Sequence, residues 1–236
     1  MRPVRLLSAC LAAGIPIAAV AEDIGPFGAL DVVGGVASGT SSTTDGGEPF
    51  ARGGVVDDVT MGPTVGLRGQ IGYRFDSSWS AFVSYQHIEG DVSWIADFPA
   101  IGASSTFDGT ATSDAILGNI AYDLPLSDVT VVKAVAGLGI SFNTLSDVME
   151  SDAASGTFLA RLADRTTIAP IVQVETGIQH TITPNAMLGL SASIAHVGGF
   201  ETGNTRRGNI GVRAINPYRI DDVWRANIAA SIRVRF

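Results

Sequence analysis

The stretch DDVWRANIAASIRVRF, Asp221–Phe236, alternates between two kinds of side chain. From Trp224 onward, apolar residues fill every second position, and the positions between them carry Arg225, Arg233 and Arg235. A period of two indicates a β-strand with two unlike faces. A packed soluble core does not accept three unpaired arginines, so the polar face predicts an interior of another kind. An apolar outside and a polar inside are typical of a transmembrane β-barrel.

The composition agrees with a membrane protein that crosses the bilayer with strands. Hydrophobic residues make up 46% of the 236 residues, enough for one sizeable domain. Beyond the N-terminus, no apolar run approaches the roughly 20 residues that a membrane helix needs. The 28 glycines suit turns and a narrow interior, and they argue against long helices.

The N-terminus has the features of a secretory signal peptide. Arg2 and Arg5 precede the apolar run Leu6–Val20, and Ala21 completes a small-residue cleavage site. We therefore predict a signal peptide over residues 1–21 and a mature barrel domain over residues 22–236. Lipidation at Cys10 is the weaker alternative, because a cut before Cys10 would leave the apolar run on the mature chain.

The charge balance opposes nucleic-acid binding. The whole chain has a formal net charge of −8, and loss of the two arginines within residues 1–21 makes it −10 (−8 − 2). A polyanionic partner would be repelled by such a chain.

Alternation and turn residues together predict eight strands. We place them at Phe27–Ala37, Thr64–Phe75, Trp79–Trp94, Ser113–Leu124, Val129–Phe142, Arg165–Ile182, Ala186–Val197 and Asp222–Phe236. Short connections at 76–78, 125–128 and 183–185 alternate with long ones at 38–60, 96–112, 143–164 and 198–221. The predicted fold is all-β: an eight-stranded antiparallel transmembrane β-barrel with short periplasmic turns and four long extracellular loops.

Aromatic residues fall near both ends of the predicted strands, as expected for two membrane interfaces. The short-turn belt consists of Tyr73, Phe75, Trp79, Tyr122 and Phe236, and the loop-end belt of Trp94, Phe142, Phe200 and Trp224.

Charged residues occupy inward positions of the same strands. They are the cations Arg68, Arg74, Lys133, Arg225, Arg233 and Arg235 and the anions Asp31, Asp123 and Glu175. They can line a pore or a ligand site, or they can form an ion-paired plug in a barrel only wide enough for side chains. We favour the plug, with Arg68 facing Glu175 near mid-barrel and Asp31 with Lys133 in a second layer, because unpaired burial of these charges is prohibitive.

The signal peptide, the alternating segments, the long loops and the terminal Phe236 resemble the small outer-membrane β-barrel families of Gram-negative bacteria. The resemblance is to the opacity-protein and porin-like group, similar to the barrel domain of outer-membrane protein A. It implies export to the outer membrane by a Sec-type route, contact with outer-membrane lipid, and a final strand read by the barrel-assembly machinery through Trp224, Ile232, Val234 and Phe236. A peptidoglycan-binding domain, which often follows such a barrel, is not expected because the chain ends at Phe236.

Catalytic and metal-binding patterns are weak, and we expect no cofactor, no metal and no enzyme activity. The histidines have no His or Cys at metal-ligand spacing. Ser193 and His196 differ in strand parity, so they face opposite sides. In the last long connection, the arginines provide candidate contacts to lipopolysaccharide phosphates: Arg206, Arg207, Arg213 and Arg219.

Three functions remain open at this point. The first is a closed barrel with a structural, envelope-integrity or surface-interaction role. The alternative is a narrow porin-like channel for small solutes, and a distant third is a lipid-modifying barrel enzyme.

Overall fold

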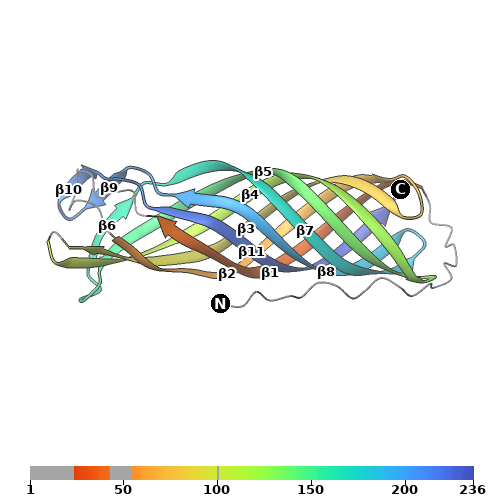
Figure 1. The fold of residues 1–236 in the computed structure, drawn as a ribbon, viewed down its shortest axis with the longest axis horizontal. Coiled ribbons are helices and arrows are strands. Elements are labelled where there is room, and N and C mark those ends of the chain that lie inside the picture. Colours follow the sequence, from red (N-terminus) through yellow and green to blue (C-terminus); the bar gives the residue numbers. More distant parts are fainter. Residues whose placement is uncertain (1–23, 43–54, 100) are drawn as a thin grey trace, which may run out of the picture.

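The computed structural model describes residues 24–42, 55–99 and 101–236, and within them eight long strands form a closed antiparallel barrel (Figure 1). They are β1 (Gly25–Ser42), β2 (Val55–Arg74), β3 (Trp79–Phe98), β4 (Ala103–Ser127), β5 (Thr130–Asp152), β7 (Arg165–Thr183), β8 (Ala186–Glu201) and β11 (Arg219–Arg235). The predicted eight-stranded fold is confirmed. The predicted signal peptide, residues 1–21, lies outside the described residues.

Sequence neighbours pair around the ring, and two further ladders close it. The first and last strands pair from Phe27 with Arg235 up to Ser42 with Arg219, and β5 pairs directly with β7. Between these two strands, β6 (Phe158–Leu162) leaves the ring and joins the short hairpin β9 (Thr205–Gly208) and β10 (Gly211–Ala214). Within the described ranges, no helix is long and apolar enough to span a bilayer.

The strands extend further into the predicted loops than the sequence analysis placed them. The predicted loop 96–112 is largely strand, because β3 runs to Phe98 and β4 begins at Ala103. The predicted loop 143–164 is similarly occupied by the upper part of β5 and by β6. These segments read as loops because their outward side chains are Ser, Thr and Asp. Most of their inward side chains are apolar, with Ser105, Asn143 and Glu150 as buried polar exceptions. Residues 43–54 of the first predicted loop lie outside the described ranges.

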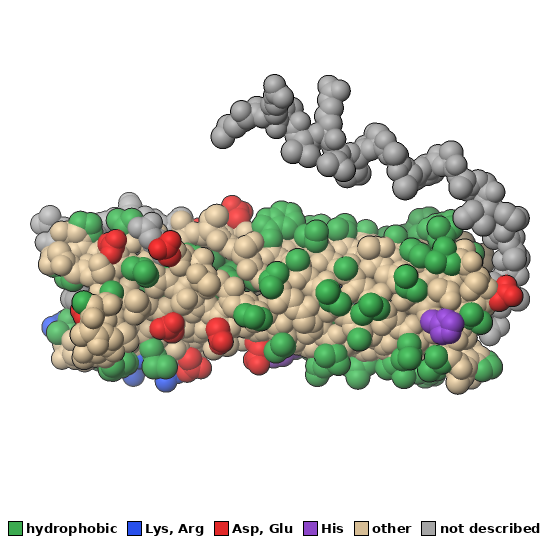
Figure 2. Space-filling model, turned by 90° about the horizontal axis from the view of Figure 1, so that it is seen from below, with side chains coloured by type: hydrophobic (Ala, Val, Ile, Leu, Met, Phe, Trp, Pro, Cys, Tyr) green, Lys and Arg blue, Asp and Glu red, His purple; other side chains and the backbone are tan. Residues whose placement is uncertain are grey.

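Near the short turns, outward positions carry an apolar band. Figure 2 shows the hydrophobic side chains spread over this half of the barrel, and the acidic ones mostly over the opposite half. Exposed members of the band include Leu30, Val32, Val65, Leu67, Ile71, Val83, Ile116, Ile120, Leu138, Val172, Val174, Leu190 and Ile228. The alternation in Trp224–Phe236 predicts this apolar exterior, which faces lipid in a transmembrane β-barrel.

At the loop end the two faces exchange character. Glu89 and Asp91 point outward and are exposed, whereas Val92 and Trp94 on the same strand are buried inside. The inward side chains there form one apolar cluster, which we call the loop-end core. Its buried members are Val92, Trp94, Ala96, Phe98, Phe107, Ala111, Ala115, Leu117, Leu145, Val148, Leu162, Ile171, Ala195, Val197, Phe200, Ile220 and Val223.

Three aspartates mark irregularities where the strands pass into this upper part. Asp58, Asp147 and Asp222 are the non-glycine residues with positive φ in the described chain, at 51°, 55° and 51°. Pairing registers shift beside each of them. Aspartate tolerates this conformation better than most residues, and an extra residue in one strand redirects the side chains that follow.

Candidate functional site: the barrel interior

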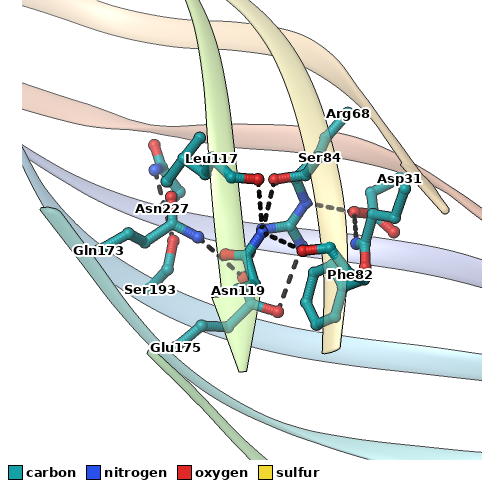
Figure 3. A network of polar contacts seen from close by, with 11 residues as sticks. Asp31, Arg68, Phe82, Ser84, Leu117, Asn119, Gln173, Glu175, Ser193 and Asn227 are labelled. Carbon is teal, nitrogen blue, oxygen red and sulfur yellow. Dashed lines mark hydrogen bonds and ion pairs between the residues drawn. The ribbon is translucent and has the colours of Figure 1, made fainter. Parts of the chain in front are cut away.

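Arg68 on β2 is the centre of a buried ion-pair network (Figure 3). Its Nε donates to the Asp31 carboxylate on the neighbouring strand, and its Nη1 and Nη2 donate to both oxygens of Glu175 from β7. Asp31 is 0% exposed and also accepts from the Gln70 amide. Because β2 and β7 are separated in the ring, the contact with Glu175 joins different parts of the wall across the lumen. The predicted pairing of Arg68 with Glu175 is therefore present.

The second predicted layer is organised differently. Asp31 was expected to face Lys133, but in the structure it faces Arg68, its direct partner in the β1–β2 ladder. Lys133 instead lies over two aromatic rings, with its Nζ 5.1 Å from the Phe82 centroid and 5.7 Å from that of Phe27. The other cation of this layer, Arg233, lies 4.1 Å from the Phe27 centroid. Ring faces therefore attract both cations.

Near the short turns, Arg74 closes the bottom of the lumen. Its Nη1 is 3.1 Å from the carboxylate of Asp123 on β4, and β3 lies between the two strands. The same guanidinium donates to the backbone carbonyls of Asp76 and Ser77 at 3.0 and 2.7 Å. One side chain thus fixes the β2–β3 turn to the interior ion pair. Arg235 is half-buried close to this end and contacts the Met187 sulfur at 3.1 Å.

Amide side chains occupy the level above the Arg68 network. The Asn119 amide donates to the Ser84 hydroxyl at 3.0 Å and to the Leu117 carbonyl at 3.2 Å. A Cβ at Gly137 would meet the Asn119 oxygen at 2.2 Å, so glycine makes room for this side chain. Gln173 donates to Glu175 at 3.3 Å and links the amide level to the ion pairs.

A further buried ion pair lies beside the loop-end core. Arg206 on β9 donates through Nε to Glu150 on β5, which also accepts from the Ser105 hydroxyl at 3.0 Å. Burial, with Glu150 nearby, raises the pKa of the Tyr218 hydroxyl and keeps it neutral. Arg206 is 4% exposed, so its predicted contact with lipopolysaccharide is wrong. The pairing of β6 with β9 places this arginine on the inner face.

The remaining arginines of the last connection differ in their partners. Arg207 and Arg213 are exposed on the β9–β10 hairpin. Arg219 is exposed as well, but its Nε is 3.4 Å from Glu201. Contact of these three side chains with lipopolysaccharide stays a prediction.

Two of the predicted belt residues are not on the outer surface. Trp94 is 2% exposed and Phe200 is 4% exposed, and both belong to the loop-end core. The Trp94 and Phe107 rings stack with centroids 5.2 Å apart, and Tyr218 lies 4.8 Å from Phe107. The other predicted belt residues are exposed: Tyr73, Phe75, Trp79, Tyr122, Phe142, Trp224 and Phe236. In the final strand, Ile232 and Val234 also point outward.

Among the described residues, two of the cavities between these interior groups are small. One, of about 20 Å³, lies beside the Arg68 network and Lys133. The other, of about 10 Å³, lies beside Arg225 and is partly lined by Ala111, Phe200 and Val223 of the loop-end core. A cavity needs roughly 10–15 Å³ to hold one water molecule. Both cavities therefore suit single water molecules or single ions, and neither has room for an organic solute.

The Ser193 and His196 side chains lie on opposite sides of the barrel wall. The Ser193 hydroxyl accepts from Asn227 inside the barrel at 3.4 Å. His196 lies on the outer face, 5.1 Å from the Trp224 ring and 3.8 Å from Asp222. Among the residues that the structure describes, no cluster of three or more His, Cys, Asp or Glu side chains could hold a metal ion.

Sequence reasoning missed the polar groups of the loop-end core, namely Glu150, Tyr218 and Glu201. Glu150 and Glu201 fell in segments predicted to be solvent-exposed loops. One signal could have shown that the barrel wall continues into the predicted loops. The alternation of β3 persists there, and Val92, Trp94, Ala96 and Phe98 share the parity of inward Ser84.

Comparison with known proteins agrees with this architecture. A family model for the outer membrane protein beta-barrel domain matches residues 7–216. The fold is similar to that of OprG from Pseudomonas aeruginosa, with a TM-score of 0.52 and 15% identity over 90% of this chain and 97% of that one. Neisserial surface protein A is also similar, with a TM-score of 0.48 and 17% identity over 89% and 97% of the two chains. Among curated protein sequences, nothing matches.

Proposed function

The chain belongs to the outer membrane protein β-barrel domain family, and on that premise we propose that it is a closed barrel with a structural or surface-interaction role. It lies in the outer membrane of a Gram-negative bacterium. One observation carries the proposal: side chains fill the lumen at two successive levels. Below is the Arg68 network with its ion pairs, and above is the loop-end core. A solute would have to displace both.

A narrow channel remains the second candidate, and a specific observation favours it. The interior within the apolar band carries more cations than carboxylates, and Arg225 and Arg233 form no ion pair within the described residues. Polar groups that are imperfectly paired admit water more readily than an apolar core does. Water and small anions could then pass if the loop-end core opened.

Planar-bilayer recording of the purified chain separates the two candidates. We expect no steady conductance from the wild-type barrel, because the two levels block the lumen independently. A stable channel that passes small solutes would reject the closed barrel. Glu175→Ala provides the matched comparison: it opens the lower level alone, and we expect brief openings at most, because the loop-end core still closes the lumen.

For the surface role, the β9–β10 hairpin is the part that supports contact with lipopolysaccharide. Arg207 and Arg213 present exposed guanidinium groups, which suit phosphate oxygens. We expect the double variant Arg207→Gln/Arg213→Gln to bind lipopolysaccharide vesicles more weakly than the wild type in a salt-dependent assay. Arg161→Gln is the control, because Arg161 is already paired with Asp147. Equal loss in the control would reject this contact.

A further inference from the structure

Arg225 on β11 is a buried cation without a partner. It points inward between the amide level and the loop-end core, and it is 3% exposed. Its Nε and Nη2 contact no acceptor within the described chain. Its direct neighbours in the two adjoining ladders are Ala37 and Ala195, which offer no polar side chain. The guanidinium thus lacks the carboxylate that Arg68, Arg74 and Arg206 each have.

Two other unpaired polar groups line the same cavity of about 10 Å³. They are the Thr64 hydroxyl on β2 and the Ser113 hydroxyl on β4, both buried and without a hydrogen-bond partner. The carboxylate residue of the lining, Asp91, occupies an outward, exposed position of β3. The other side chains are apolar: Ala37, Met61, Ile88, Ala111, Phe200 and Val223. Three strands therefore contribute unpaired donors to the lining of one small cavity.

The chemistry of these groups defines what the cavity can hold. A guanidinium donates hydrogen bonds, accepts none and keeps its charge in proteins, while a hydroxyl can donate. Leaving a charge buried without a counter-charge is costly. A water molecule would accept two hydrogen bonds but would leave the charge uncompensated. A monoatomic anion can accept from such donors and neutralises the charge. The cavity is at the lower limit for one water molecule, so a halide fits when the flexible Arg225 side chain moves slightly outward, whereas phosphate, sulfate and a carboxylic acid are too large.

We propose that Arg225, Thr64 and Ser113 form a buried binding site for a single halide ion, with chloride as the physiological occupant. The ion lies where the polar interior of the apolar band meets the loop-end core. It acts as the missing counter-charge of Arg225, so its binding stabilises the folded barrel. The site is independent of whether the lumen conducts.

The test is the stability of the full-length barrel in lipid vesicles in sodium chloride against sodium gluconate of equal ionic strength. Gluconate is too large for the cavity. Above the dissociation constant, each tenfold rise in chloride should shift the folding equilibrium by about tenfold toward the folded state. Arg225→Met should abolish this dependence and should be at least as stable as the wild type in gluconate. If Arg225 instead had a purely structural role, Arg225→Met would reduce stability in both salts.

Two further variants keep the proposal falsifiable. Arg233→Met removes a buried cation outside the cavity and should retain the wild-type response to chloride. Thr64→Val/Ser113→Ala should weaken the response while leaving stability in gluconate near that of the wild type, which covers the case in which Arg225→Met fails to fold. Equal wild-type stability in both salts would overturn the proposal and leave water as the occupant. A chloride response that persists in Arg225→Met would overturn it too.

Discussion

The lower and upper parts of the same strands have opposite polarity. On β3, Ala81 and Val83 point outward near the short turns and Ser84 points inward, whereas higher up Glu89 points outward and Trp94 inward. The pleat continues without interruption along this strand. Where the wall faces lipid, apolar side chains outside cost nothing and the interior can be polar. Where the wall faces water, the hydrophobic effect drives apolar side chains inside. The surroundings of the wall, and not the strand geometry, determine which face is apolar.

Each part is consequently stabilised by different interactions. The lower interior depends mainly on ion pairs and hydrogen bonds, beside a small apolar cluster of Phe27, Phe82, Ala121 and Val135. Removing a partner there is costly because the groups are buried. The upper interior depends on packed aromatic and aliphatic side chains, as in a soluble β-barrel. Substitutions that test one mechanism should therefore have little effect on the other.

Arg68→Ala should have the largest effect on stability. It leaves both the Asp31 and the Glu175 carboxylates buried without their cation, and breaking a buried pair typically costs about 3–5 kcal/mol. We expect a loss near the upper end of that range in urea unfolding of the vesicle-inserted barrel. Glu175→Gln is the matched control, since it removes one charge and retains a hydrogen-bond acceptor. A loss below about 1 kcal/mol for Arg68→Ala would mean that the network does not hold the lower interior together.

Trp94→Ala should destabilise the upper part by about 4 kcal/mol, since replacement of a buried Phe or Trp by Ala costs about 3–5 kcal/mol. The damage should remain local. Limited proteolysis should cut the loop end while the lower barrel stays protected. Trp79→Ala, at an exposed outward position, should leave the loop end resistant. Similar proteolysis of both variants would show that Trp94 is no part of a packed core.

A pair of charge insertions on one strand compares the two outer surfaces directly. Ile120 and Thr112 both occupy outward positions of β4. Ile120→Arg places a cation in lipid, which costs about 2–4 kcal/mol near the bilayer midplane. Thr112→Arg faces water opposite Glu89, its partner in the β3–β4 ladder, and should change the free energy of unfolding by less than about 0.5 kcal/mol. Equal costs at the two positions would contradict the assignment of the lipid boundary.

Replacement of a carboxylate in the turns at the two ends of the barrel should have the smallest effect on stability, and this effect should depend on pH. Backbone N–H groups of Ser78 and Trp79 lower the pKa of Asp76 in a short turn, and the Ser155 hydroxyl and N–H lower that of Asp152 at the loop end. A lowered folded-state pKa stabilises above the ordinary carboxyl value of about 4 and loses this contribution as the pH falls through the folded value. Asp76→Ala and Asp152→Ala should therefore reduce stability slightly at neutral pH and not at acidic pH. Urea titrations at both pH values measure the free energy of unfolding. A larger loss of stability at acidic pH than at neutral pH would contradict the expected direction.

The sequence predicted the lower part well because its outward positions are apolar and most of its charged residues point inward, although Phe27 and Phe82 are also buried inside. Alternation in Trp224–Phe236 defined the last strand, and counting from the turns placed Arg68 and Glu175 at one height. Height alone did not identify neighbours, so the direct register of Asp31 with Arg68 was missed.

The upper part was predicted less well because the rule of apolar side chains outside and polar side chains inside was also applied there. Trp94 and Phe200 were assigned outward positions as apolar aromatics, although the parity of Trp94 already placed it inward. Arg206 was assigned to the surface because a charged residue in a Gly-rich segment usually faces water. Its inward position depends on pairing between β6 and β9, two short strands far apart in sequence, which no local pattern encodes.

Site-directed spin labelling measures the exchange of polarity along β3 position by position. Single labels at Ala81, Val83, Glu89 and Asp91 report whether an outward position faces lipid or water. Oxygen, which partitions into lipid, should relax the labels at Ala81 and Val83, and a water-soluble nickel complex should relax those at Glu89 and Asp91. Oxygen accessibility that continues unchanged through Asp91 would show that lipid covers the upper wall as well, and that the polarity of the wall does not follow its surroundings.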